Sequence, residues 1–115
     1  MAVQLKRVYD DADEADGFRV LVDRLWPRGV SKERAAVDVW LKDVAPSTDL
    51  RVQWHHDPGR FEEHAGRYRA ELESNPAVAE LRELVAGHPV TTLLYGSKDP
   101  ELNHARVLKD FLEHG

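Results

Sequence analysis

The residues best suited to chemistry lie in two short polar segments, 23–29 and 95–104, each of which follows an apolar run. In the first segment Arg24 and Arg28 flank Trp26, within a turn that also holds a proline and a glycine. Arginine forms paired hydrogen bonds with a carboxylate or a phosphate, and tryptophan offers a flat face for stacking. We therefore interpret these three residues as ligand-binding, for an anion or a nucleotide. The alternative is that Arg24 pairs with the preceding aspartate or another carboxylate and that Trp26 only packs.

The second segment joins a predicted strand to a predicted helix. Asp99 followed by Pro100 is typical of a helix start, in which Asp99 caps the helix and Pro100 takes its first position. The free N–H groups of such a helix end attract anions. The ligand-binding candidates are Tyr95, Ser97, Lys98 and Asn103, and the candidate general acid or base is His104. The alternative is a polar turn with a purely structural cap.

No known catalytic signature is complete. The sequence contains no Walker A motif and no GxGxxG, HExxH or GxSxG pattern. Ser97 lies between a strand and a helix, as some nucleophiles do, but it lacks the flanking glycines of a nucleophile elbow. The chain has no cysteine, which excludes disulfides, thiolate metal sites and a cysteine nucleophile. Whether the protein is an enzyme stays open at this point, and we expect no cofactor.

Histidines suggest a metal site only weakly. His55, His56 and Asp57 are of the residue types that bind metals. Neighbouring residues at a helix end point in different directions, so these three would need His64 or His104 brought alongside by the fold. We therefore predict no metal site and interpret His55 and His56 as histidines that stabilise a helix C-terminus.

Two apolar strands must position the candidate residues. The uncharged run 90–95 predicts a central strand covered on both faces, and 18–26 predicts a second inner strand that ends at Arg24 to Arg28. A helix from Pro100 is expected to bury one face against the sheet. Its apolar residues are Leu102, Ala105, Leu108, Phe111 and Leu112.

The other elements follow from weaker patterns. Alternation predicts a first strand over 4–9 and a third over 37–43, with a helix as the alternative for the third. Four further helices are predicted: a short one capped by Ser31, one capped by Ser47 that carries Leu50 and Trp54, one over 58–73, and one from Asn75-Pro76 to Gly87.

Composition narrows the class of protein. A chain of 115 residues is expected to form one domain, 1–115. No 18-residue apolar run and no signal peptide is present, so we expect a soluble cytoplasmic protein without a membrane partner. The net charge of −5 arises from 21 acids against 16 bases, and five of the acids lie in the segment 10–16, which predicts a solvated acidic loop on a balanced body. Because no basic stripe with interleaved aromatics occurs, we expect no nucleic-acid partner.

Four sequence blocks carry a family resemblance. They are RVLVDRLWPRG (19–29), WLKDVAPS (40–47), WHHDP (54–58) and LLYGSKDPELNHA (93–105). Together they resemble the YeaO-like branch of the bacterial domain of unknown function 488 family. This resemblance implies a compact α/β domain in the bacterial cytoplasm, and no established reaction.

The resemblance also implies what chemistry this chain lacks. Other branches of the family carry a cysteine at the position of Tyr95, and Cys-His-Arg in place of Asn103-His104-Ala105. Only His104 is shared with that pattern here. Any cysteine chemistry of those branches is therefore not available to this chain in the same form.

The expected architecture is an α/β fold with a small, mainly parallel sheet of three or four strands flanked by helices. We predict that the ends of the strands at 24–28 and 95–98 are adjacent and form one basic, aromatic-lined pocket. The first functional hypothesis is an enzyme or binding module for a small anionic ligand, phosphate- or nucleotide-like. The second is a regulatory or interaction domain that presents the same Trp and Arg side chains to a protein partner without catalysis. A concave pocket favours the first, and a flat apolar patch favours the second.

Overall fold

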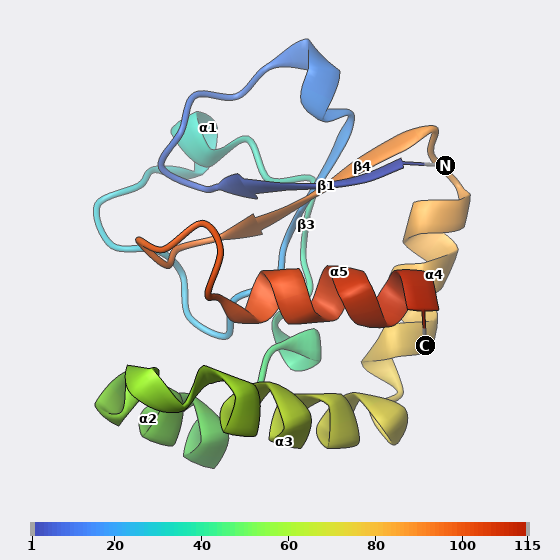
Figure 1. The fold of residues 1–115 in the computed structure, drawn as a ribbon. Helices are drawn as coiled ribbons and strands as arrows, with labels where there is room; N and C mark the ends of the chain where they lie inside the picture. The colour runs from blue at the N-terminus through green and yellow to red at the C-terminus, as the bar shows by residue number, and fades with distance from the viewer. Residues whose placement is uncertain (1, 115) are drawn as a thin grey trace.

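The computed structural model describes residues 2–114, which form a four-stranded parallel sheet covered on both faces (Figure 1). The strand order is β1-β4-β2-β3. The strands are β1 (Ala2–Arg7), β2 (Phe18–Leu21), β3 (Val39–Trp40) and β4 (Val90–Tyr95). The predicted α/β fold with a small, parallel sheet is thus confirmed.

The helices are divided unequally between the two faces of the sheet. The α-helices of residues 2–114 are α1 (Lys32–Ala35), α2 (Thr48–His56), α3 (Phe61–Glu73), α4 (Ala77–Ala86) and α5 (His104–His114). Short 3-10 helices are η1 (Glu14–Asp16), η2 (Lys42–Val44) and η3 (Pro58–Arg60). Helices α2 to α5 lie on one side of the sheet, and α1 lies on the other (Figure 1). Within residues 2–114 no helix is long and apolar enough to cross a membrane.

β4 is the central strand, as its uncharged sequence predicts. It pairs in parallel with β1 along its whole length and with β2 from Thr91 to Leu94. All its residues after Val90 are buried. Since β2 and β4 are parallel neighbours, their carboxyl ends lie side by side, which confirms the predicted adjacency of the two polar segments.

The larger part of the core lies between the sheet and helices α2 to α5. The largest fully buried side chain of residues 2–114 is that of Tyr68 on α3, whose hydroxyl donates to the Val44 carbonyl oxygen at 2.7 Å. Burial raises the pKa of Tyr68 well above its ordinary value, and the negative charge of Glu71 acts in the same direction. A smaller apolar cluster, which includes Leu21, Ala35 and Leu94, lies on the α1 side.

A buried ionic cluster ties the acidic segment to the sheet. Asp16 is only 5% exposed and lies between Lys6 Nζ, at 3.1 Å, and the guanidinium of Arg19. Arg19 also donates to the Ala35 carbonyl oxygen at 2.7 Å. The Thr92 hydroxyl donates to the Asp16 carbonyl oxygen at 2.6 Å. The prediction of a wholly solvated acidic loop is therefore wrong at its last residue, which anchors the loop across three strands.

Two predicted strands are shorter than expected. β2 ends at Leu21 and not at position 26. The next N–H group available after β4, that of Gly96, donates to the side chain of Asp23 at 2.8 Å and not to the backbone of the β2 segment. β3 comprises only Val39 and Trp40, in place of 37–43, since its one neighbour β2 is itself short.

Helix α5 begins at His104, four residues after the predicted start at Pro100. The Asp99 carboxylate does accept from two backbone N–H groups, those of Glu101 and Leu102, but they belong to a turn that precedes the helix. Asn103 instead accepts from the N–H of Arg106 and caps α5. Leu102, which was predicted to be buried, consequently lies outside the helix and is exposed.

The start of α3 also differs from the prediction. Residues 58–60 form η3, and the α-helix starts at Phe61. The side chain of Asp57 makes no capping hydrogen bond. The helix caps predicted at Ser31 and Ser47 are confirmed, since each serine oxygen accepts from a backbone N–H three residues later.

Candidate functional site

The carboxyl ends of β2 and β4 open into one pocket with a volume of about 780 Å³. Three chain segments supply most of its lining: the loop after β2, helix α2 with the residues before it, and the loop from β4 into α5. Tyr9 and Pro58 complete the lining. Ligands of open α/β folds bind at the carboxyl ends of the parallel strands, where this pocket lies. The volume lies within the range of small-molecule sites, about 300–1,000 Å³.

Most of the predicted site residues line this pocket. They are Arg24, Trp26, Arg28, Ser97, Lys98, Asn103 and His104. Tyr95 does not belong to the lining, because its side chain points to the helix-covered face of the sheet and is only 3% exposed. The predicted stacking role therefore rests on Trp26 and not on Tyr95.

His104 is fixed by two groups at the end of β2. Its Nε2 atom lies 3.1 Å from the Val22 carbonyl oxygen and 3.2 Å from Asp23 Oδ1. Since a carbonyl oxygen can only accept, Nε2 carries the hydrogen and Nδ1 is left as the basic nitrogen. Asp23 Oδ1 receives no hydrogen bond, because the Nε2 hydrogen points towards Val22, so its contact with the ring is electrostatic. Histidine is the side chain that most often serves as a general acid or base, so His104 is the candidate for such a role at this site.

Gly96 positions Asp23 in this arrangement. Its N–H donates to Asp23 Oδ2 at 2.8 Å, and a β-carbon on Gly96 would lie 2.9 Å from the same oxygen. A larger residue at position 96 must therefore displace the carboxylate, and with it the electrostatic contact to His104.

We expect Gly96→Ala to change the environment of the His104 ring, and hence its ¹⁵N chemical shifts, with a smaller effect on the stability of the fold. The readout is the pair of ¹⁵N chemical shifts of the His104 ring, followed as a function of pH. Gly66→Ala on α3 is the control, since a β-carbon there meets nothing within 4 Å. That control should stabilise the helix by about 0.5–1 kcal/mol and leave the His104 shifts unchanged. Identical His104 shifts in the wild type and Gly96→Ala would contradict the positioning role of Gly96.

Arg24 is held by carbonyl groups and not by a carboxylate. Its Nε donates to the Pro46 carbonyl oxygen at 3.1 Å, and its Nη2 donates to that of Ala45 at 3.2 Å. The structural ion pair considered as an alternative is therefore wrong for this residue. The two contacts tie the end of β2 to the segment before α2 and leave the positive charge of Arg24 uncompensated.

Four cations line the pocket without an acidic partner. Arg24, Arg28, Arg51 and Lys98 form no ion pair with any carboxylate of residues 2–114. The two acids in the lining are otherwise engaged. Asp23 faces His104 and Gly96, while backbone hydrogen bonds from Leu102 and Glu101 lower the pKa of Asp99. The pocket is thus electropositive in a chain whose net charge is negative.

Trp26 is fixed in the wall of the pocket. Its indole N–H donates to the Val30 carbonyl oxygen at 2.7 Å, and its ring packs edge-on against Trp40, with ring centroids 5.5 Å apart. The ring can therefore offer a surface to a ligand without losing conformational freedom on binding.

Sequence reasoning missed the contribution of helix α2. Arg51, Trp54 and His55 all line the pocket. Their spacing of three and four residues places them on one face of a helix, which is a signal that the sequence does contain. What it does not contain is the direction of that face, because the fold sets α2 opposite the loop after β2. Asp23 and the exposed Leu25 and Leu102 were missed as well.

Of the histidines considered as metal ligands, only His64 is held by packing. His64 is buried, with Nε2 at 2.9 Å from the Asp57 carbonyl oxygen and its ring stacked on Trp54. His55 lies in the pocket lining. Residues 2–114 contain no group of three or more histidine, cysteine, aspartate or glutamate side chains placed to hold a metal ion.

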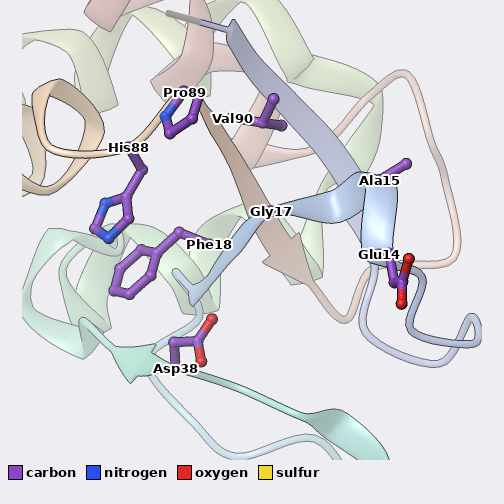
Figure 2. A pocket seen from close by; sticks show the side chains of 8 residues that line it. All are labelled: Glu14, Ala15, Gly17, Phe18, Asp38, His88, Pro89 and Val90. Carbon is purple, nitrogen blue, oxygen red and sulfur yellow. The ribbon is translucent and has the colours of Figure 1, made fainter.

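A second hollow, of about 480 Å³, lies at the other end of the strands, where β2 and β4 begin (Figure 2). Its main feature is the stacked pair of Phe18 and His88, whose ring centroids are 3.8 Å apart. The Asp38 carboxylate in this hollow already accepts from the Arg19 N–H, and His88 Nδ1 contacts the Leu84 carbonyl oxygen. Because these polar groups are engaged within the protein, the hollow offers little to a ligand, and the pocket at the strand carboxyl ends is the candidate site.

Comparisons with other proteins identify the family. The family model described as "Inactive DUF488-N3 subclade" matches residues 2–115. The uncharacterized protein Rv3073c of Mycobacterium tuberculosis is 48% identical over 110 residues, which cover 96% of this chain and 92% of the relative. The uncharacterized protein YeaO of Escherichia coli is 43% identical over 112 residues, 97% of each chain. No solved structure matches the chain. The resemblance seen in the four sequence blocks is thus confirmed, and the chain belongs to the DUF488 family, in its inactive N3 subclade.

Proposed function

We propose that this protein binds a small anionic ligand, phosphate- or nucleotide-like, in the pocket at the carboxyl ends of β2 and β4. The observation that carries the proposal is the set of four cationic side chains in the lining that have no carboxylate partner. Like charges gathered around one concavity repel one another, and low-dielectric walls strengthen their joint field. An anion placed among them would relieve this repulsion and accept several charge-assisted hydrogen bonds.

Side chains, more than the N-terminus of α5, would hold the anion. Asn103 already accepts from the N–H of Arg106, and Asp99 occupies the N–H groups just before the helix. The helix end therefore has fewer free donors than its sequence predicts. Arg24, Arg28 and Lys98, with the Ser97 hydroxyl, are the proposed direct contacts.

His104 is the residue we assign to proton exchange with the ligand. Its ring borders the pocket, and the hydrogen bond to the Val22 carbonyl oxygen fixes the hydrogen on Nε2. If the ligand undergoes a reaction, His104 would serve as its general acid or base. The word "inactive" in the family description supports binding without turnover as the principal role.

A thermal-shift screen tests this proposal. The protein is heated with phosphate, sulfate, nucleotides or sugar phosphates, beside the variant Arg28→Ala. A ligand at a hundred times its dissociation constant adds about 2.7 kcal/mol of stability, which shifts the melting temperature by several degrees. We expect one class of anion to stabilise the wild type, and Arg28→Ala to abolish most of that shift.

Lys32→Ala is the matched control for this screen. Lys32 is an exposed cation of α1 that does not line the pocket, so its loss should leave the anion-induced shift intact. If no anion stabilises the wild type, or if Lys32→Ala and Arg28→Ala weaken the shift equally, the pocket is not an anion site.

A protein-interaction role is the second candidate. The observation in its favour is the exposure of Leu25 and Leu102, since large exposed apolar side chains often contact partners. Both residues, however, border a concave pocket and not a flat patch. This arrangement favours a small ligand with an apolar part.

A further inference from the structure

Arg51 has a donor that the protein does not use. Its Nε atom is buried and has no hydrogen-bond partner in residues 2–114, although the residue lines the pocket. A buried donor on a charged group is costly to leave unpaired, so a ligand oxygen that accepts from Nε would remove this cost.

The backbone of Arg51 is fixed in the first turn of α2. The Arg51 N–H donates to the Ser47 carbonyl oxygen at 2.8 Å. Ser47 is held in turn by the Glu71 carboxylate, which accepts from its N–H at 2.9 Å and from its hydroxyl at 2.6 Å. The first turn of α2 is therefore anchored to α3, and the guanidinium is presented to the pocket from a rigid support.

The number of free cations indicates how much charge the ligand carries. With Arg51 included, four unpaired cations border the pocket. A carboxylate brings one negative charge, whereas a phosphomonoester carries about −1.5 to −2 at pH 7 and has three acceptor oxygens. The planar guanidinium of arginine can donate to two phosphate oxygens at once, so the arginines suit such a group best.

The pocket also has an apolar side. Leu25 and Leu102 are 59% and 52% exposed, and both belong to its lining. Leu102 is held in place because its N–H donates to Asp99 Oδ1 at 3.0 Å. Exposed leucines that are held at the edge of a charged pocket offer contact to an apolar part of a ligand.

Trp54 adds a rigid aromatic surface on the α2 side. One neighbour, His64, stacks on its ring at 5.6 Å, and Phe61 and Tyr68 pack against it edge-on. Trp54 cannot turn away without disturbing this cluster. Because the pocket volume of about 780 Å³ is far larger than an inorganic phosphate needs, ring and charge can be accommodated together.

We infer that the ligand is a phosphomonoester joined to a flat ring, of the nucleoside monophosphate class, and that Arg51 is one of its phosphate-binding residues. This inference rests on the proposed function. It adds a second recognition element, the apolar side formed by Leu25, Trp54 and Leu102, and a donor on α2 that the sequence did not reveal.

Isothermal titration calorimetry with four kinds of probe tests the inference. The probes are inorganic phosphate, the nucleosides, the four common nucleoside monophosphates, and ribose 5-phosphate. We expect at least one nucleoside monophosphate to bind about tenfold or more tightly than phosphate, ribose 5-phosphate and its own nucleoside, because only it engages both sides of the pocket.

Three variants assign the residues, and a fourth serves as their control. Arg51→Ala should weaken binding of the monophosphate about tenfold or more, and Arg51→Lys should restore only part of it, since lysine lacks the Nε donor and the planar fork. Leu102→Ala should weaken the monophosphate and leave phosphate unaffected. Arg67→Ala, which removes an exposed arginine of α3 outside the pocket, should bind as the wild type does. Melting temperatures check that each variant is folded.

The outcomes separate this inference from the proposed function. If phosphate binds as tightly as every monophosphate and Leu102→Ala has no effect, the pocket is an anion site and the inference about the ring is wrong. Equal binding of nucleoside and monophosphate, or an Arg51→Ala variant that binds like the wild type, overturns the assignment of Arg51 to phosphate. Failure of all phosphate-bearing probes to bind contradicts both the inference and the proposed function, and favours the protein-interaction candidate.

Discussion

Replacement of Gly17 with alanine should destabilise the fold by about 4 kcal/mol, a large part of the 5–15 kcal/mol that a typical domain has. Gly17 joins η1 to β2 with φ +64° and ψ −131°, a backbone conformation that side chains strongly disfavour. A β-carbon there would also lie 2.3 Å from the carbonyl oxygen of Val90, where β4 begins. The oxygen belongs to the backbone of the central strand and cannot move aside without disturbing the sheet. Urea denaturation of the purified variant measures the effect.

Gly29→Ala separates the two causes of this loss. Gly29 also has a positive φ, +73°, but a β-carbon there meets nothing within 4 Å. Gly29→Ala should therefore lose only the cost of a positive φ, about 1–2 kcal/mol. Equal losses in the two variants would show that contact with Val90 contributes nothing.

Asp16→Asn is expected to cost about 3 kcal/mol at neutral pH. The substitution leaves Lys6 and Arg19 without their carboxylate at a site where Asp16 is buried, and an uncompensated buried charge is strongly destabilising. The amide keeps the size of the side chain, so the loss reports charge and hydrogen bonding rather than packing. Asp10→Asn, in the exposed part of the same segment, should change stability by less than about 0.5 kcal/mol.

The effect of Asp16 should depend on pH in a defined direction. Burial by itself would raise the pKa of Asp16. The hydrogen bond from the Asp13 N–H, the hydrogen bonds from Lys6 and Arg19, and the charge of Lys6 outweigh burial and lower the pKa below its ordinary value of 3.8. A carboxyl with a lowered pKa stabilises the folded state above pH 3.8 and loses this contribution as the pH falls through the folded-state pKa. The difference between wild type and Asp16→Asn should thus be constant near neutrality and shrink below pH 4. A difference that grows on acidification would contradict this account.

The elements with strong local signals could be predicted from the sequence. The uncharged run 90–95 indicates a buried central strand, and serine caps at Ser31 and Ser47 mark the starts of two helices. The start of α5 could not be predicted from the same kind of signal. Asp99 followed by Pro100 satisfies the same N–H groups in an isolated turn as in a helix, and only the Asn103 cap decides between them.

The site residues that directly follow a strand could be predicted from the sequence. Those that the packing of α2 brings to the pocket could not. Arg24, Trp26 and Arg28 follow one strand directly, so the geometry of a parallel sheet is enough to place them near Lys98 and His104. Arg51 and Trp54 enter the site through the packing of α2, which no local pattern encodes. Tyr95 was assigned to the pocket although side chains alternate along a strand. It shares the face of Leu93, which the helices cover.

The strand order sets when this protein can fold during its synthesis. β1 leaves the ribosome before the other strands of this sheet, but its only partner in the sheet is β4, to which Ala2 pairs at Val90 and Arg7 at Tyr95. β2 likewise has only the two-residue β3 beside it until β4 arrives. The strand edges that later pair with β4 therefore stay unpaired through most of translation. Contacts between residues so distant in sequence also form slowly. Helices α2 to α4 can form meanwhile, but the surface against which they pack is completed only with β4. Slow translation before position 90 should thus prolong exposure to aggregation, and chains truncated before β4 should retain at most the two-residue pairing of β2 with β3.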